Sequence, residues 1–256
     1  MTCSLAVVAL LVFAQSQDLD LAMEPLESRA IIVEEVLEQA DALEMVDPAE
    51  AFEYWLDAAH AGVPRAMHIV ATRLHDGTWV RRDRRAAASW WRQAASLGHV
   101  ASAYNFGWCR LQGHGVSRCA PDAVRWLGFA AQHGHVDAMA TYASCLSNGI
   151  AGPFDSAAAV VWWNKAAKQG HVQSMRALAL AWQFGKGVKA DVQKASLWWQ
   201  RAAEGGDVQA MLVTAAHYEI GHGLPRDVER ADEWYAKASY LLLPAPQPVA
   251  LTLVTD

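Results

Sequence analysis

Residues 90–98 read WWRQAASLG, and the same arrangement returns as WWNKAAKQG at residues 162–170 and WWQRAAEGG at residues 198–206. The first aromatic of each copy belongs to a column whose members lie 36 residues apart. That column is Tyr54, Trp90, Trp126, Trp162, Trp198 and Trp234. Alanine always follows four positions later, and no insertion or deletion interrupts the register from residue 47 to residue 239. A fixed period in the thirties is typical of stacked helical pairs.

One unit, residues 174–209, shows why the pattern predicts two helices. The first helix covers about residues 174–184 and ends at Gly185, because glycine readily takes the left-handed conformation that a helix end needs. The second begins at Asp191, whose carboxylate can accept the free amide protons of the first turn. Its tryptophans and alanines are spaced to share an inward face, and it ends at Gly206.

Tryptophan and alanine complement each other in this inward face. Alanine lets neighbouring helix backbones approach closely, and the indole ring fills the gap to the next helix. A buried tryptophan removes ~150–250 Å² from water, which at ~25 cal/mol per Å² corresponds to roughly 4–6 kcal/mol as an upper bound. We therefore expect the aromatic columns to form the core that joins one unit to the next.

The stretch from Gly185 to Gly206 resembles the Sel1-like repeat family, whose consensus is an alanine-led helix, then G-x-G-V-x-x-D, then K-A-x-x-W-Y-x-K-A-A-x-x-G. The resemblance covers about 210 of the 256 residues and implies an all-α fold, a right-handed α-solenoid of stacked helix-turn-helix units. Four units depart from the consensus: unit 30–65 loses both turn glycines, and three others differ in the turn or at the helix cap. Cys119 replaces the aspartate in one, Trp79 replaces the second turn glycine in another, and Ala151-Gly152-Pro153 predicts an irregular turn in a third.

The register divides the chain into consecutive segments. The prediction is a signal peptide at 1–16, an acidic cap with a degenerate repeat at 17–65, repeats at 66–101, 102–137, 138–173, 174–209 and 210–243, and a Pro-rich tail at 244–256. Pro244, Pro246 and Pro248 forbid further helix in the tail.

The N-terminus bears on localisation. The apolar run Leu5–Ala14 is ten residues long, too short to span a bilayer but suited to the core of a signal peptide, with an acceptable cleavage site before Gln15. This predicts a periplasmic or secreted protein. The alternative is a buried N-terminal capping segment in a cytoplasmic protein, because no Lys or Arg precedes the run. No other stretch reaches membrane-spanning length.

The net charge of −6 is unevenly distributed. Residues Asp18–Glu50 contain eleven acidic side chains and one basic one, Arg29, so the rest of the chain is slightly basic. The absence of a strong basic stripe argues against nucleic-acid binding. The cluster RRDRR at residues 81–85 is the exception. It is either a solvated or internally paired loop, or a docking site for an acidic partner.

No motif for catalysis, a cofactor or a metal appears, so we predict no catalytic residues, no cofactor and no metal site. The column His99, His135, His171 and Asp207 offers zinc-type ligands, but equivalent positions in stacked units lie ~8–10 Å apart. We expect these residues to start the following helices instead. Cys109 and Cys145 share a column and are expected to be small core residues, with a redox role as the alternative. A single disulfide among Cys109, Cys119 and Cys145 stays open, and the sequence does not choose the pair.

Partner binding is predicted on the concave face that the first helices of the units line. Positions that vary there are free to recognise a ligand, and the predicted patch is Tyr104, Trp108, Arg176 and Phe184, unless these side chains belong to the core. What the family resemblance implies is a non-enzymatic scaffold or adaptor for a protein or peptide, here a monomer. The alternatives are a hydrolase or penicillin-binding type of enzyme on a repeat scaffold, and an element that self-associates.

Overall fold

The computed structural model describes residues 37–242. Within this range residues 37–43 are helical, and eleven further helices follow without any strand. These helices are α3 (Pro48–His60), α4 (Pro64–Asp76), α5 (Arg84–Ser96), α6 (Val100–Gln112), α7 (Ala120–Gln132), α8 (Val136–Ser147), α9 (Ser156–Lys168), α10 (Val172–Phe184), α11 (Val192–Glu204), α12 (Val208–Ile220) and α13 (Val228–Leu242). The all-α prediction is confirmed. The predicted signal peptide and the whole Pro-rich tail at 244–256 lie outside the described residues.

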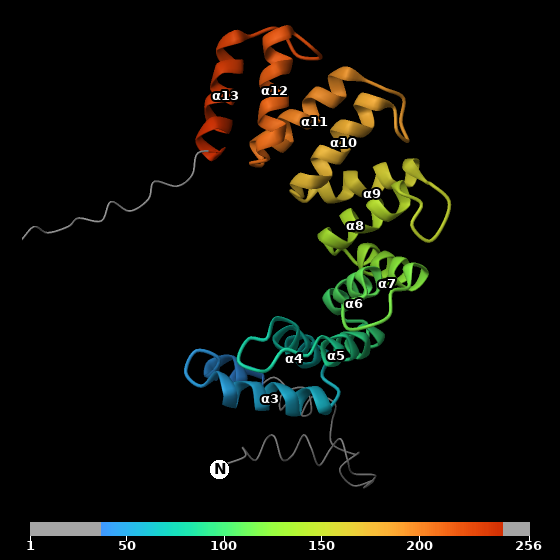
Figure 1. Cartoon of the computed structure of the whole chain (residues 1–256), viewed down its shortest axis with the longest axis vertical. Helices are drawn as coiled ribbons and strands as arrows, with labels where there is room; N and C mark the ends of the chain where they lie inside the picture. The colour runs from blue at the N-terminus through green and yellow to red at the C-terminus, as the bar shows by residue number, and fades with distance from the viewer. Residues whose placement is uncertain (1–36, 243–256) are drawn as a thin grey trace, which may run out of the picture. The chain divides into compact units, whose positions relative to one another are not determined.

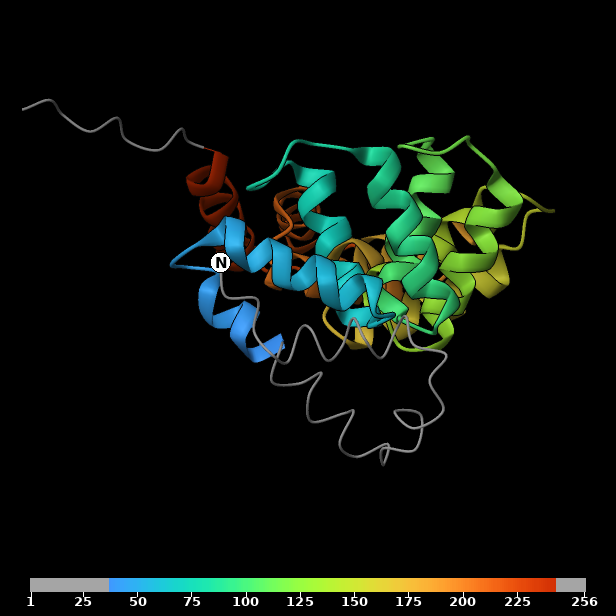
Figure 2. The ribbon, with the colours of Figure 1, turned by 90° about the horizontal axis from the view of Figure 1, so that it is seen from below.

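The chain forms two compact units. The first extends to Cys145 and includes residues 149–153, and the second holds the rest of the chain, with helices α9 to α13. Within each unit every helix packs against its neighbours in the chain, α3 to α7 in the first and α9 to α13 in the second (Figures 1 and 2). This succession of helical hairpins is the stacking that the 36-residue register predicts.

The core of each unit follows the repeat columns. The alanines four positions after the first aromatic are at most 1% exposed; they are Ala58, Ala94, Ala130, Ala166, Ala202 and Ala238. The second aromatic column is buried at Trp55, Trp91 and Trp199, and Leu127 takes the same place. These rings and methyl groups pack helix against helix, as expected.

The first aromatic column differs from the expectation of a shared inward face. Its tryptophans are half-buried, and four of them carry a cation over the ring. Lys165 lies 3.8 Å from the Trp162 ring centroid, and Arg201 lies 4.6 Å from that of Trp198. Adjacent helical residues point about 100° apart, so only one of the two aromatics can point to the centre of the interface. The other aromatic lies at the edge of the interface and covers it.

Aspartates begin the second helices, as predicted. Asp83 accepts hydrogen bonds from the amides of Arg85 and Ala86, and Asp191 accepts one from Lys194. This backbone bond is the largest cause that lowers the pKa of Asp191. Helix α7 is the exception, because Cys119 occupies its N-cap and makes no side-chain hydrogen bond to the helix.

Replacing Cys119 by aspartate should therefore stabilise the protein. Cys119→Asp supplies the missing acceptor for the α7 amides, and we expect the free energy of unfolding to rise by about 1 kcal/mol. Urea denaturation of wild type and variant measures the change. Cys119→Ala, which adds no acceptor, is the control and should not raise stability; equal behaviour of the two variants would contradict the capping argument.

Where a unit has two turn glycines, the two have different structural roles. The first ends the first helix in the left-handed conformation, as Gly185 does with φ +69°. The second allows the turn to touch the preceding unit. A Cβ on Gly187 would overlap the backbone carbonyl of Ser156, and a Cβ on Gly115 would overlap that of Arg84. The second glycine therefore sets how closely the turn packs against the start of the preceding second helix.

Two units lack the second glycine yet keep the same turn. Trp79 and Ala151 occupy its position with φ +67° and +68°, and they are the only non-glycine residues with positive φ among residues 37–242. The turn after α8 also keeps the hydrogen bond from Ile150 N to Cys145 O that corresponds to Lys186 N to Ala181 O. The turn at residues 151–153 thus shares this backbone conformation with the others, although α8 ends at Ser147, one repeat position earlier than α10 at Phe184. The hydrogen bond from Ile150 N to Cys145 O holds the backbone of this turn in place.

The second-glycine contact predicts a difference between two substitutions. Gly206→Ala places a Cβ at φ +93° with no atom within 4 Å, so it should cost about 1 kcal/mol from backbone strain alone. Gly187→Ala adds overlap with the Ser156 carbonyl and should cost about 2–4 kcal/mol. Thermal and urea denaturation test this ranking. If Gly187→Ala were no more destabilising than Gly206→Ala, the turn would not be closely packed.

Candidate functional site

Tyr104 and Trp108, which the sequence places on one face of a helix, lie on α6 and line the same pocket. The pocket has a volume of about 290 Å³ and lies between α4, α5 and α6. We call it the α4–α6 pocket. Its lining is Thr72, His75, Asp76, Trp91, Tyr104, Asn105, Trp108 and Cys109. The predicted pair of aromatics is therefore brought together at a concave site within the first unit.

Neighbouring rings hold both aromatics in place, and both remain half-buried. The Tyr104 ring stacks on His135 with centroids 4.5 Å apart. The Trp108 ring meets His114 edge-on at 4.9 Å. Burial, and secondly the charge of Asp137, raise the pKa of Tyr104, so its hydroxyl stays protonated at neutral pH. Each ring thus offers a fixed surface with part of its area accessible.

Two polar groups complete the pocket. The Asp76 side chain is 52% exposed, and its carboxylate lies 2.8 Å from Nδ1 of His75. Trp91 is 4% exposed, and its Nε1 has no hydrogen-bond partner among the residues that the structure describes. Aromatic faces beside a carboxylate favour a cationic or amphipathic side chain, and an indole N–H can donate to a carbonyl.

The other two residues of the predicted patch, Arg176 and Phe184, lie on α10 in the second unit. Arg176 Nη1 is 3.1 Å from the Asp207 carboxylate and 3.4 Å from Gln209 Oε1. Phe184 is 63% exposed. Their role in binding stays a prediction.

Some pocket residues have no counterpart in the sequence prediction. His75 and Asn105 lie beside positions that the repeat columns marked as variable, and Trp91 belongs to the aromatic column assigned to the core. Cys109 is 1% exposed, and burial raises the pKa of its thiol to about 11, as expected for a core residue. Cys109, Cys119 and Cys145 are all free thiols.

The histidine column starts helices, as the sequence suggests. Nδ1 of His99 accepts a hydrogen bond from the Ser102 amide, and His171 does the same for Ser174. Asp207 accepts from Ala210 in the same way. Between residues 37 and 242 no group of three His, Cys, Asp or Glu side chains is arranged to hold a metal ion. In the same range no helix combines the length and the apolar character needed to cross a membrane.

The same column also links one unit to the next. His68 on α4 and His99 at the start of α6 both lie 2.9 Å from Oγ of Ser102, and their ring centroids are 4.8 Å apart. Ser102 is fully buried. Burial, and after it the nearby His99 and His135, lower the pKa of His68 to about 4.

This arrangement predicts acid sensitivity. The unfolded His68 takes up a proton near pH 6.5, whereas the folded one stays neutral until about pH 4, so protonation favours unfolding. Stability should be fully present above pH 6.5 and should fall as the pH drops towards 4. His68→Gln should lose less stability than wild type between pH 7 and pH 5 in urea denaturation. An equal loss in both proteins would contradict this assignment.

Comparison with known proteins agrees with this geometry. The Sel1 repeat model matches residues 44–63, 64–99, 100–135, 136–171, 172–207 and 208–241. The chain belongs to the Sel1 repeat family. The last five segments begin at the first residues of α4, α6, α8, α10 and α12, so each of these five Sel1 repeats corresponds to one helical hairpin. Among curated proteins no match was found.

Two solved structures are similar over most of the chain. One is c5321 of uropathogenic Escherichia coli, a protective antigen with an SLR fold, at 24% identity and a TM-score of 0.79. The match covers 82% of this chain but 46% of that protein, so this chain spans about half of its length. The other is a Sel1 repeat protein from Oxalobacter formigenes, at 26% identity, a TM-score of 0.72, and coverage of 80% and 82%. Sel1 repeats of this kind form scaffolds typical of protein–protein interaction.

Proposed function

We propose that this Sel1 repeat protein is a non-enzymatic, monomeric adaptor that binds a protein or peptide partner, and that it acts in an envelope or secretory compartment. The observation that carries the proposal is the convergence of Tyr104, Trp108 and Asp76 on the α4–α6 pocket. Exposed parts of fixed aromatic rings are the usual anchors of a protein interface. The apolar segment Leu5–Ala14 supports the compartment, and N-terminal sequencing of the mature protein tests it.

The pocket favours a basic side chain of the partner. The faces of Tyr104 and Trp108 attract a cation, and the half-exposed Asp76 carboxylate can pair with it. A volume of about 290 Å³ suits one arginine or lysine side chain with part of its backbone. The partner segment would thus present an Arg or Lys side chain to the pocket.

Binding of oriented peptide libraries tests this proposal. Fluorescein-labelled libraries with arginine, glutamine or glutamate fixed at the central position are titrated with the full chain and followed by anisotropy. The arginine library should bind tightest. Tyr104→Ala/Trp108→Ala should weaken its binding at least tenfold, and Asp76→Asn should reduce the preference for arginine over glutamine.

A matched control tests whether the loss of any two exposed aromatic side chains would weaken binding. Phe154 and Tyr240 are 77% and 78% exposed and do not line the pocket, so Phe154→Ala/Tyr240→Ala should bind like wild type. Circular dichroism checks that each variant is folded. If the folded Tyr104→Ala/Trp108→Ala variant keeps the wild-type affinity and selectivity, the pocket is not the binding site.

A further inference from the structure

A second concave surface lies on a different flank of α6. Phe106 and Arg110 line it, whereas Tyr104 and Trp108 line the α4–α6 pocket. Residues two apart in a helix point about 200° away from each other around the axis. The two surfaces therefore use different sides of the same helix.

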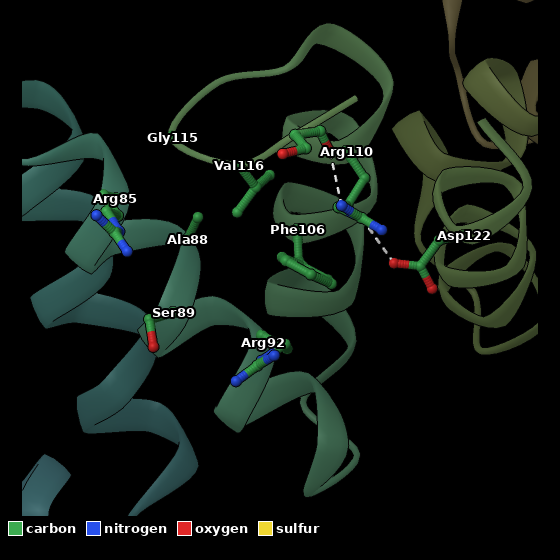
Figure 3. A pocket seen from close by; sticks show the side chains of 10 residues that line it. Arg85, Ala88, Ser89, Arg92, Phe106, Arg110, Gly115, Val116 and Asp122 are labelled. Carbon is green, nitrogen blue, oxygen red and sulfur yellow. Dashed lines mark hydrogen bonds and ion pairs between the residues drawn. The ribbon is translucent and has the colours of Figure 1, made fainter. Parts of the chain in front are cut away.

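This second surface is a pocket of about 540 Å³ between α5, α6 and the turn that follows α6 (Figure 3). Arg85, Ser89 and Arg92 lie four and three residues apart on α5, and so form one exposed stripe along the pocket. The ring of Phe106, which is 4% exposed, forms the floor.

An adjoining pocket of about 630 Å³ extends this surface along α7. It shares Arg92, Phe106 and Asp122 with the first pocket and adds Arg125 and Trp126 to the lining. We call the two together the arginine groove. It is defined by Arg85, Arg92, Phe106, Arg110, Asp122, Arg125 and Trp126.

The groove has an excess of positive charge. Its one carboxylate, Asp122, is already engaged, at 2.7 Å from Arg110 Nε and 2.6 Å from Arg125 Nη2. Neither Arg85 nor Arg92 has a carboxylate partner among residues 37–242. Four arginines against one aspartate leave three positive charges in excess. An anionic ligand would neutralise them.

The spacing of the arginines indicates the form of the ligand. Arg85 and Arg92 are seven residues apart on α5, which corresponds to about 10 Å along the helix axis. In a polyproline II segment, residues three apart share a face and lie about 9 Å apart. Two glutamates at that spacing could each pair with one guanidinium, which binds carboxylates in two-pronged geometry. An apolar side chain between them would contact Phe106 or Trp126.

We propose that the arginine groove is a second binding site, which takes an extended acidic segment of a partner protein with a carboxylate at every third residue. The site is separate from the α4–α6 pocket, so the protein could hold two partners of opposite charge at once. It also gives a function to part of the arginine-rich stretch at residues 81–85, in which Asp83 is used as a helix cap.

The acidic stretch of the chain itself is the competing occupant. In its described part, Asp41 lies 2.8 Å from Arg65, and Glu44 pairs with Arg73. Both arginines belong to α4 and lie outside the groove. The six further acidic residues between Asp18 and Glu35 have the same charge as the proposed partner.

The test uses a fluorescein-labelled peptide of four Glu-Pro-Leu repeats, titrated with the full chain at low salt and followed by anisotropy. The wild-type chain should bind it, and the same peptide with glutamine for glutamate should bind at least tenfold more weakly. Arg85→Glu/Arg92→Glu should lose at least tenfold in affinity. Arg85→Lys/Arg92→Lys keeps the positive charge but not the two-pronged guanidinium. Its affinity for the peptide should lie between that of wild type and that of the charge-reversal variant.

The control reverses the same number of charges elsewhere. Lys168 and Lys189 are exposed in the second unit and lie outside the groove, so Lys168→Glu/Lys189→Glu should bind the peptide like wild type. Equal losses in both charge-reversal variants would show attraction by net charge alone and would overturn the proposal. Circular dichroism confirms folding, and Arg85→Gln/Arg92→Gln replaces the reversal variant if that one does not fold.

A last variant separates the two occupants. Here the six acidic residues from Asp18 to Glu35 are changed to Asn or Gln in the full chain. If this variant binds the peptide and wild type does not, the chain's own acidic stretch occupies the groove, and the proposal of a partner site fails. If wild type and variant bind it equally, the partner site stands. Tyr104→Ala/Trp108→Ala should not change binding of this peptide, so failure here is distinct from failure of the adaptor proposal.

Discussion

The contact on which the structure depends is the close approach of a turn that carries the second glycine to the start of the preceding second helix. Gly187 lies against the Ser156 carbonyl and Gly115 against that of Arg84, in each case 31 residues earlier in the chain. A side chain does not fit between these backbones. This contact fixes the spacing between successive hairpins. The same spacing is needed in every unit for the Trp and Ala side chains to pack against each other. The constancy of the 36-residue register follows from this constraint.

Once the register is fixed, the remaining positions are free to vary. The alanine and second aromatic columns are used for packing, and the aspartates and histidines before the helices for capping. The helix flanks are left for the binding that we propose. On α6 one flank contributes Tyr104 and Trp108 to a pocket with a carboxylate, and another contributes Phe106 and Arg110 to a groove rich in arginine. A rigid hairpin stack can thus present two surfaces of different charge from one helix.

Sequence periodicity was sufficient for the helices, their caps and the alanine core, because each of these depends on local chemistry repeated in every unit. It could not assign the second glycine, whose neighbour lies 31 residues away. It also placed both tryptophans of each pair inward, although Trp198 closes an edge under Arg201. In the pocket it identified Tyr104 and Trp108 but not His75 or Trp91. These come from other helices, and no repeat pattern gives the directions of their side chains.

The most direct test of this account is the removal of one whole unit. Deleting residues 172–207 takes out α10, its turn and α11, and joins His171 to Val208 in the original register. If the interfaces between units are equivalent, the shortened chain should keep its helical content per residue, measured by circular dichroism, and unfold cooperatively. A deletion two residues shorter at the same place breaks the register and should lose helix beyond the removed segment. If both deletions behaved alike, or if the in-register one unfolded, the spacing between hairpins would not be the constraint that builds this fold.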